Sequence, residues 1–562
     1  MKTKKIFFPI ILSIVLLFGA CDDFLENTPN NFIVGSALTE DNLSQLTGPL
    51  YNRAWFNFNE KFYFGLGDGM AYNLNGPYSD YIYPFSDLSV NGLTAPLVSA
   101  WASLYTVAGR ATGVVLTIQA STASQELKNQ YIAEARFMRG TAYWYLASLW
   151  GNIIIVDNEQ ELSDSPIVSP NPTKDVYEYA IRDLEFAAKY LPQTAQSGRV
   201  TCYSAYGMLS RLYLDYSGYL AAFNAGGGVD KENFTVGTRD TEYLTKARKA
   251  AEKVINSGAN SLMADYADLF KIENNNNSEC LFAFQWVPGL NSDTGYGLIN
   301  TNQAYFAFGS IVTGDNAAWG GGGTGCPYDM AKEYEEGDYI RRKATWMGNG
   351  DFYPEINQAN GGLTYDEETF SAAPRWLSVK KGVTGSNKDN PAIGRMNSAY
   401  DNYILRLAEV YLNHAEAILG NNASTTDAVA LESFNKVRTR AMGISAEKTS
   451  ITYEDLRHER RVEFCMEGRY WYDLVARSYY QRQEVVNYLN NQNRGEVPPY
   501  LFDAPMNLRI DESRTMGTRA VGTATSGTFR LPYPESELLQ NPKLRGTPVP
   551  FEFTEERIDL FN

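Results

Sequence analysis

Residues 125–151, QELKNQYIAEARFMRGTAYWYLASLWG, carry the clearest helical pattern in the chain. Apolar side chains recur there at steps of three or four residues: Leu127, Tyr131, Ala135, Met138, Ala142, Tyr145 and Leu149. This spacing places them in one stripe along an amphipathic helix. Gly140, Ala142 and Ala147 are small, so the pattern predicts that a second helix approaches this one closely.

The stretch before it, residues 97–118, reads LVSAWASLYTVAGRATGVVLTI and is also typical of a helix. We expect it to pair with residues 125–151 as an antiparallel hairpin. Trp101 lies within this first helix. It is therefore expected in the core rather than in a binding site.

Similar helical patterns recur in residues 171–191, 201–220, 241–258, 401–420, 427–443 and 452–478. Helical pairs of about 34 residues, with small and aromatic residues at the packing positions, are typical of tetratricopeptide-like units. The sequence therefore predicts a mainly α fold on a tetratricopeptide-like scaffold of helical pairs, with few short strands.

Between residues 259 and 402 the helical pattern gives way to Gly, Asn and Asp, which predict turns and irregular loops. The predicted N-terminal units are a signal peptide at 1–20 and the first part of the scaffold at 21–258, with an aromatic loop insertion at about 51–93. They are followed by a loop-rich ligand-binding subdomain at 259–402, C-terminal helical pairs at 403–480, and an irregular segment packing on the scaffold at 481–562.

The N-terminus has the layout of a secretory signal. Three lysines precede an apolar run from Ile6 to Ala20, which is too short to cross a bilayer and contains Pro9. Cys21 follows directly, as in a bacterial lipoprotein signal, so we expect a lipid on Cys21. The alternative is an ordinary signal peptide with an incidental cysteine. Both readings place the protein outside the cytoplasm.

The overall charge and the cysteines exclude some functions. The formal net charge of -16 disfavours nucleic acid and anionic lipid as partners, because both attract clustered cations. The other cysteines are Cys202, Cys280, Cys326 and Cys465, without the spacing of a metal site, and are expected to be mostly buried free thiols. No cofactor is expected. A structural calcium ion is compatible with the Asp- and Asn-rich loops, although EF-hand spacing is absent.

Four stretches in this order resemble the SusD/RagB family of Bacteroidetes surface lipoproteins: residues 133–156, 402–417, 456–477 and 531–544. The resemblance covers nearly the whole chain. It implies about four tetratricopeptide-like helix pairs that support an irregular subdomain. It also implies that the protein is lipid-anchored and exposed on the outer membrane, where it captures a glycan and delivers it to a SusC-like TonB-dependent barrel. Asp22 and Asp23 resemble the signal that sends such lipoproteins to the outer face.

Glu463 and Glu467 invite an enzymatic interpretation, because paired carboxylates hydrolyse glycosides. Arg460 and Arg469 lie nearby, however, and a cation beside a carboxylate lowers its pKa, which makes it a poor general acid. Two carboxylates one helical turn apart also project from the same face of a helix, whereas a glycosidase places its pair on either side of the glycosidic bond. We therefore expect structural ion pairs and no catalytic residues. The two histidines, His414 and His458, are expected to be structural or surface residues.

Aromatic loops carry the remaining functional signal, because sugar rings stack on flat aromatic faces while Asn and Asp bind their hydroxyls. The predicted ligand-binding residues of the first loop are Tyr72, Tyr78, Tyr81, Tyr83 and Asp80, together with Asn73 and Asn75. Those of the later loops are Trp286, Asn291, Asp293, Tyr296, Asp315, Asn316, Trp319 and Trp346. For each ring the alternative is anchoring of its loop against the scaffold.

The sequence thus predicts a surface glycan-binding lipoprotein. Three alternatives remain open at this stage. They are a RagB-like protein that captures peptides, a surface glycosidase, and a structural lid whose ligand contacts are made mainly by the transporter.

Overall fold

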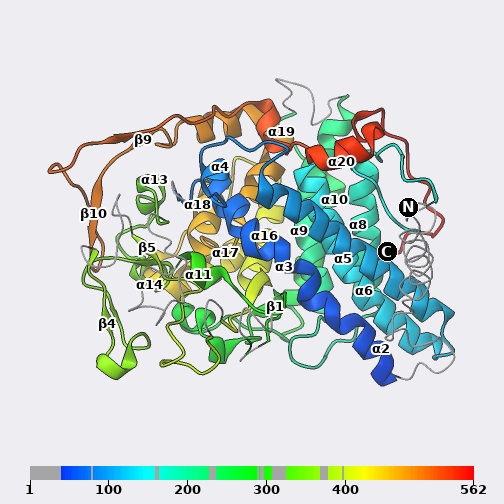
Figure 1. Cartoon of the computed structure of the whole chain (residues 1–562), viewed down its shortest axis with the longest axis horizontal. Coiled ribbons are helices and arrows are strands. Elements are labelled where there is room, and N and C mark those ends of the chain that lie inside the picture. The colour runs from blue at the N-terminus through cyan, green and yellow to red at the C-terminus, as the bar shows by residue number, and fades with distance from the viewer. Residues whose placement is uncertain are drawn as a thin grey trace, which may run out of the picture.

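The computed structural model describes residues 40–76, 80–158, 164–226, 236–287, 290, 297–306, 324–367, 377–394 and 398–561. Long helices stack on one side of the molecule, and a loop-rich part with short strands forms the other (Figure 1). The prediction of a mainly α fold with few short strands is confirmed.

The long helices are α5 (Ala95–Ala120), α6 (Gln125–Leu149), α8 (Thr173–Tyr190), α9 (Cys202–Asn224), α10 (Thr241–Ile255), α16 (Leu407–Leu419), α17 (Ala428–Met442), α18 (Tyr453–Glu463) and α19 (Tyr470–Asn490). Helices that follow one another along the chain pack side by side from α5 through α10. Helix α16 then packs on α10, although the loop-rich region separates them in sequence. The predicted hairpin of residues 97–118 and 125–151 is α5 packed on α6.

The close approach expected at Gly140 occurs between α6 and α8. A Cβ atom at position 140 would lie 2.9 Å from the carbonyl oxygen of Ala180 and 3.0 Å from Cβ of Asp183. Both distances are shorter than ordinary van der Waals contact, so a larger residue would push the two helices apart. Trp101 is also where the sequence placed it, since it is buried in α5 with its ring 5.1 Å from that of Trp150.

The shorter helices are α2 (Glu40–Thr47), α3 (Phe56–Lys61), α4 (Tyr83–Ser86), α11 (Asn302–Phe306), α13 (Tyr328–Ala331), α14 (Tyr339–Thr345) and α20 (Glu535–Gln540). The antiparallel strand pairs are β1 (Cys280–Phe284) with β6 (Asn402–Arg406), β2 (Trp346–Met347) with β5 (Ser378–Val379), β3 (Phe352–Tyr353) with β4 (Leu363–Thr364), β7 (Ser424–Thr425) with β8 (Ile451–Thr452), β9 (Glu496–Val497) with β12 (Gly517–Thr518), and β10 (Tyr500–Asp503) with β11 (Asn507–Ile510). The pair β1–β6 matters most for function. It joins the two ends of the loop-rich region, with Cys280 opposite Arg406, so the chain leaves and re-enters the scaffold at one place.

A buried network of arginines and carboxylates fills the junction between the scaffold and the loop-rich region. Glu463 is fully buried and pairs with Arg406 at 3.1 Å, with Arg341 at 3.3 Å and with Arg440. Burial by itself raises the pKa of Glu463, but Arg440, Arg406 and Arg341 outweigh it and lower the pKa to about 2. Glu463 is therefore ionised near neutral pH and forms structural ion pairs, as the sequence predicted.

Glu467 also forms structural ion pairs, as the sequence predicted. Its carboxylate lies 2.9 Å from Nζ of Lys381 and 2.7 Å from Nε of Arg406. The helix that carries Glu463 starts with a capping box, in which Thr452 and Asp455 exchange hydrogen bonds. The ion pairs of Glu463 and Glu467 thus have a structural role, because they connect α18 and the turn after it to the loop-rich region.

The histidines and cysteines also have structural places. His414 is buried and its Nδ1 lies 2.8 Å from Oγ of Ser433, whereas Nδ1 of His458 lies 3.0 Å from the carboxylate of Glu333. The four described cysteines are free thiols, three buried and Cys280 partly buried, as expected. Across the described ranges, no helix combines the length and apolar character that crossing a membrane requires.

Candidate functional site

The structure brings together two regions that the sequence predicted as aromatic loops. The backbone of Asn75 exchanges hydrogen bonds of 3.0 and 2.9 Å with that of Gly325, which joins the insertion at 51–93 to the region at 259–402. The ring of Phe64 lies 4.7 Å from that of Phe306. Helices α3, α4 and α11 consequently lie close together at the centre of the view in Figure 1.

The insertion is anchored to the scaffold through residues 65–70, which form a π-helical segment. The carboxylate of Asp68 accepts hydrogen bonds from the backbone N–H groups of Met466 (2.9 Å) and Gly468 (2.8 Å). A Cβ atom at Gly67 would lie 2.2 Å from the backbone of Gly468, so only glycine fits at this contact. Burial raises the pKa of Asp68 to about 6 despite these hydrogen bonds.

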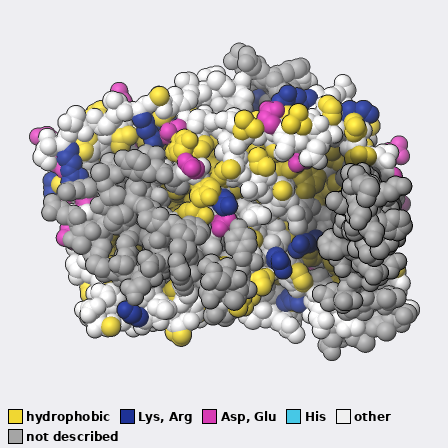
Figure 2. All heavy atoms as spheres, in the orientation of Figure 1, with side chains coloured by type: hydrophobic (Ala, Val, Ile, Leu, Met, Phe, Trp, Pro, Cys, Tyr) yellow, Lys and Arg dark blue, Asp and Glu magenta, His cyan; other side chains and the backbone are white. Residues whose placement is uncertain are grey.

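Tyr81 lies where the two loop regions meet, and it is partly exposed. Its ring stands at 89° to that of Tyr305, with the centroids 5.2 Å apart, and Nζ of Lys61 lies 5.4 Å from the Tyr81 centroid. Tyr83 is 38% exposed, and Asp80 is also exposed. We call this group of five residues, Asp80, Tyr81, Tyr83, Tyr305 and Lys61, the aromatic ledge. Figure 2 shows hydrophobic side chains gathered near the centre of the face that it draws.

The ledge has the chemistry of a carbohydrate-binding surface. The exposed parts of the Tyr81 and Tyr83 rings offer apolar faces for stacking, and the carboxylate and ammonium groups of the ledge accept and donate hydrogen bonds. Tyr305 and Lys61 were not among the residues predicted from the sequence. Tyr305 lies in an aromatic stretch, residues 305–308 (YFAF), which was the only available signal. The position of Lys61 depends on how α3 packs.

Trp286 lies just after β1, with only 5% of its surface exposed. Its indole N–H donates a 2.9 Å hydrogen bond to Oδ1 of Asn402, and its backbone N–H donates one of 2.9 Å to Asp401. The ring packs edge to face against Phe56 and Phe284, with centroids 6.3 and 6.5 Å apart. Trp286 is therefore rigidly held, and its contact with a ligand stays a prediction.

A chain of buried amides continues from this tryptophan. Asn300 donates to Oδ1 of Asn402 (2.9 Å), Asn402 donates to Oδ1 of Asn302 (2.9 Å), and Asn59 donates to the same oxygen of Asn302 (3.3 Å). These four side chains come from the insertion, from α11 and the turn before it, and from β6. The amides thus fix the position of Trp286 relative to α3 and α11, which carry Lys61 and Tyr305.

Two predicted binding residues belong to the core instead. Tyr72 is 1% exposed, donates a 3.0 Å hydrogen bond to the carbonyl of Asn493, and lies with its ring 4.9 Å from the guanidinium of Arg494. Trp346 is fully buried in β2 opposite Val379. Neither ring offers a face to a ligand in this structure, which corrects the expectation for both. They anchor their loops, as the alternative interpretation had it.

The neighbouring asparagines are also structural. Asn73 is buried, where its Oδ1 accepts a 2.9 Å hydrogen bond from Arg461 and its amide donates to Asp68. Asn75 is likewise buried beside Gly325. The remaining predicted residues lie outside the described residues and stay predictions: Cys21, Tyr78, Asn291, Asp293, Tyr296, Asp315, Asn316 and Trp319. No cluster of metal-ligating side chains occurs within the part of the chain that the structure describes.

Two family models match this chain. Residues 230–549 match the model described as the SusD family, and residues 24–214 match one described as "Starch-binding associating with outer membrane". A SusD-like protein of Bacteroides ovatus is 38% identical over 577 residues, covering 99% of this chain and 99% of the relative. The starch-binding protein SusD of Bacteroides thetaiotaomicron is 26% identical over 385 residues, covering 61% of this chain and 63% of the relative.

Solved structures agree with the sequence matches. A crystal structure with xylogluco-oligosaccharide is 36% identical, with a TM-score of 0.81 over 91% of this chain and 100% of the other. A laminarin-binding SusD-like protein is 19% identical, with a TM-score of 0.66 over 90% of this chain and 96% of the other, and shares the fold.

Proposed function

The chain belongs to the SusD family, and from that premise we propose that it is a cell-surface glycan-binding lipoprotein. It binds an oligosaccharide or polysaccharide outside the cell and delivers it to a SusC-like, TonB-dependent outer-membrane transporter. A lipid on Cys21 anchors it in the outer membrane, with the folded body exposed at the surface. The protein itself catalyses no reaction.

The observation that carries the proposal is the likeness to the structure solved with xylogluco-oligosaccharide, which extends over the full length of that chain. At 36% identity and a TM-score of 0.81, the scaffold and the loop-rich part have counterparts in both proteins. A neutral oligosaccharide of this kind is therefore the first ligand to test.

The aromatic ledge supports a glycan ligand on physical grounds. Sugar rings have apolar C–H faces and polar rims, so a site needs rigid aromatic side chains with hydrogen-bonding groups beside them. Tyr81 is braced by Tyr305 and flanked by Lys61, which meets both needs without an exposed cation cluster. The acidic chain as a whole also favours a neutral ligand over an anionic one.

The state of the paired glutamates supports binding without hydrolysis. A glycosidase needs one protonated carboxyl group as general acid near neutral pH. The pKa of Glu463 is instead lowered to about 2, and both Glu463 and Glu467 are enclosed by arginine and lysine side chains. Both carboxylates are buried among these cations, so neither can reach a glycosidic bond.

The test uses the protein without its signal peptide and Cys21, run in native gels that contain a panel of neutral and charged polysaccharides. We expect at least one neutral polysaccharide to retard the protein, while chromatography of the incubated glycan detects no released sugar. Product release would contradict the binding-only proposal and favour a glycosidase. Retardation by no glycan, with binding to a peptide library, would favour peptide capture.

A further inference from the structure

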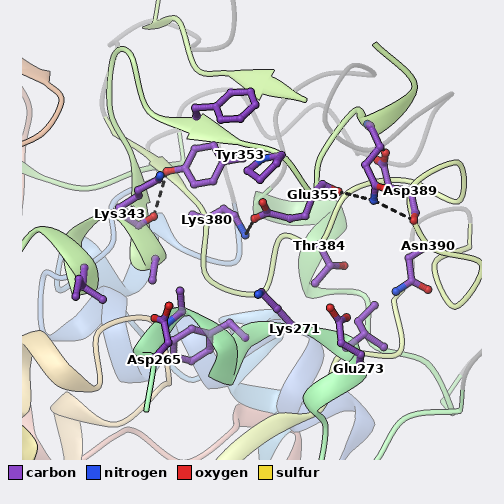
Figure 3. A pocket seen from close by; sticks show the side chains of 18 of the residues that line it. Asp265, Lys271, Glu273, Lys343, Tyr353, Glu355, Lys380, Thr384, Asp389 and Asn390 are labelled. Carbon is purple, nitrogen blue, oxygen red and sulfur yellow. Dashed lines mark hydrogen bonds and ion pairs between the residues drawn. The ribbon is translucent and has the colours of Figure 1, made fainter. Parts of the chain in front are cut away.

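A cavity of about 660 Å³ lies in the loop-rich region, and it shares no lining residue with the aromatic ledge. It is bounded by residues 265–273, helix α14, strand β3 with the turn after it, and residues 380–391 (Figure 3). Its volume falls within the roughly 300–1,000 Å³ that is typical of small-molecule sites. The family resemblance and the predicted aromatic loops left this cavity without a role.

The walls of the cavity are held in place by hydrogen bonds and ion pairs of their own. Nζ of Lys380 lies 3.2 Å from the carboxylate of Glu355 and donates to the carbonyl of Val383 at 3.0 Å. Between the same two segments, the backbone N–H of Gln358 donates a 2.9 Å hydrogen bond to Asp389. These contacts connect the turn after β3 to the segment at 380–391. A ligand would therefore meet a preformed site, at a small cost in conformational entropy.

The cavity has an exposed aromatic wall. Phe352 is 45% exposed, and a Cβ atom at Gly362 would lie 2.7 Å from its ring, so the glycine lets this ring settle against the backbone. Tyr339, from α14, is partly exposed on another wall, and the neighbouring Ile340 is 40% exposed. Apolar surface that stays in water beside a hollow is available for stacking by a ligand.

The charges of the lining are mixed and almost balanced. Three lysines, Lys271, Lys343 and Lys380, face four carboxylates, Asp265, Glu273, Glu355 and Asp389. Lysines and carboxylates in nearly equal number do not select a strong anion such as phosphate, which requires unopposed cations. Lysine ammonium groups donate and carboxylates accept hydrogen bonds, as the hydroxyl groups of a neutral sugar require.

Among the lysines of the lining, Lys343 is the one placed to donate hydrogen bonds to such a ligand. Within the described residues Lys343 forms no ion pair, and its ammonium lies 5.7 and 5.5 Å from the ring centroids of Tyr339 and Tyr353. Figure 3 shows Lys271, Lys380 and Thr384 around the same space, so hydroxyl and ammonium groups approach it from different segments.

We propose that this cavity is a second saccharide site, which binds a neutral mono- or disaccharide unit of the captured glycan by stacking on Phe352 and by hydrogen bonds to Lys343 and its neighbours. The ligand class rests on the proposed function, whereas the position of the site rests on the cavity alone. Two separate contacts with one chain of sugars would raise the avidity for a polysaccharide without strengthening either contact.

The test is calorimetric titration of the soluble protein with a short xylogluco-oligosaccharide, together with saturation-transfer NMR using cellobiose and xylose. We expect two molecules of oligosaccharide per protein chain. Phe352→Ala should remove one of them and weaken binding at that site by about tenfold or more. Phe352→Tyr keeps the ring and should retain both, and Tyr81→Ala should remove only the other.

The outcomes separate this inference from the proposed function. One molecule per chain, lost in Tyr81→Ala and unchanged in Phe352→Ala, would overturn the second site and leave the proposed function intact. If neither the variants nor the unmodified protein bound the oligosaccharide, the result would count against both the second site and the proposed function. Because Phe352 is exposed, we expect the variant to fold, which circular dichroism checks. Lys343→Ala gives a second measurement, and its failure to lower affinity for either sugar would contradict the assigned hydrogen bonds.

Discussion

The indole N–H of Trp286 donates a 2.9 Å hydrogen bond to the side-chain oxygen of Asn402, a residue 116 positions away along the chain. This bond links the end of β1 to the start of β6. The side chain of Asn402 also accepts a hydrogen bond from the amide of Asn300 and donates one to Asn302. One side chain therefore holds the tryptophan and the neighbouring turn together.

We predict that Asn402→Ala lowers glycan affinity by loosening Trp286. The change leaves two buried donors, on Trp286 and Asn300, without their acceptor, and should lower the free energy of unfolding by about 1–3 kcal/mol. Asn413→Ala is the control, since Asn413 is a buried amide bonded to Ser210 in the scaffold. Asn413→Ala should lower the free energy of unfolding in urea by a similar amount and leave glycan retardation unchanged. Equal affinity losses in both variants would argue against a specific role for Asn402.

The second prediction concerns Tyr81 in the aromatic ledge. Stacking needs the ring and not the hydroxyl group, so Tyr81→Phe should keep glycan affinity and Tyr81→Ala should lower it by about tenfold. Phe223→Ala removes a ring that is 44% exposed on α9, outside the ledge, and serves as the control. Affinity gels and calorimetry measure the three variants. Unchanged binding in Tyr81→Ala would remove this residue from the site.

The third prediction follows from the lowered pKa of Glu463. Its carboxyl group titrates near its ordinary value of 4.5 when unfolded and at about 2 when folded, because Arg440, Arg406 and Arg341 favour the ionised form. A group with a lowered folded pKa stabilises the protein above its unfolded pKa. That contribution disappears as the pH falls from about 4.5 through about 2, and amounts to about 3 kcal/mol.

Urea unfolding of the unmodified protein and of Glu463→Gln, measured from pH 6 to pH 2, isolates this contribution. We expect the difference in unfolding free energy between the two proteins to be largest at pH 6 and to shrink in acid. The difference cancels other groups that titrate in this range, among them Asp68, whose raised pKa acts in the opposite direction. A difference that does not vary with pH would contradict the ionised state assigned to Glu463.

The scaffold could be predicted from the sequence because its evidence is local. The stripe along residues 125–149 and the small Gly140 report directly on α6 and its contact with α8. The packing of loop aromatics is not local. Tyr72 and Trp346 come from loop-rich stretches like Tyr81 does, but they are buried by partners far away in sequence, Arg494 and Val379. Composition shows that a loop is aromatic and does not show which ring faces inward.

The same limit explains the residues that sequence reasoning missed. Tyr305 braces Tyr81 across 224 positions of the chain, between the same two regions that the pairing of Asn75 with Gly325 joins. The cavity beside Phe352 is likewise assembled from four segments that no sequence spacing connects. The loop-rich region was correctly expected to be irregular, but its internal arrangement depends on long-range pairs.

The last prediction separates membrane attachment from ligand binding. If Cys21 is acylated, each buried CH₂ group of its lipid adds about 0.8 kcal/mol of membrane affinity, so several acyl chains make the attachment effectively permanent. Cys21→Ala should then move the protein from the membrane fraction to the soluble fraction of fractionated cells, while glycan retardation of the purified protein stays the same. Cys202→Ala is the matched control, because Cys202 is a buried free thiol in α9 and should leave the protein in the membrane fraction. Retention of the Cys21→Ala protein in the membrane fraction would contradict the lipid anchor, and loss of glycan binding in that variant would show that the residue acts on the ligand site as well.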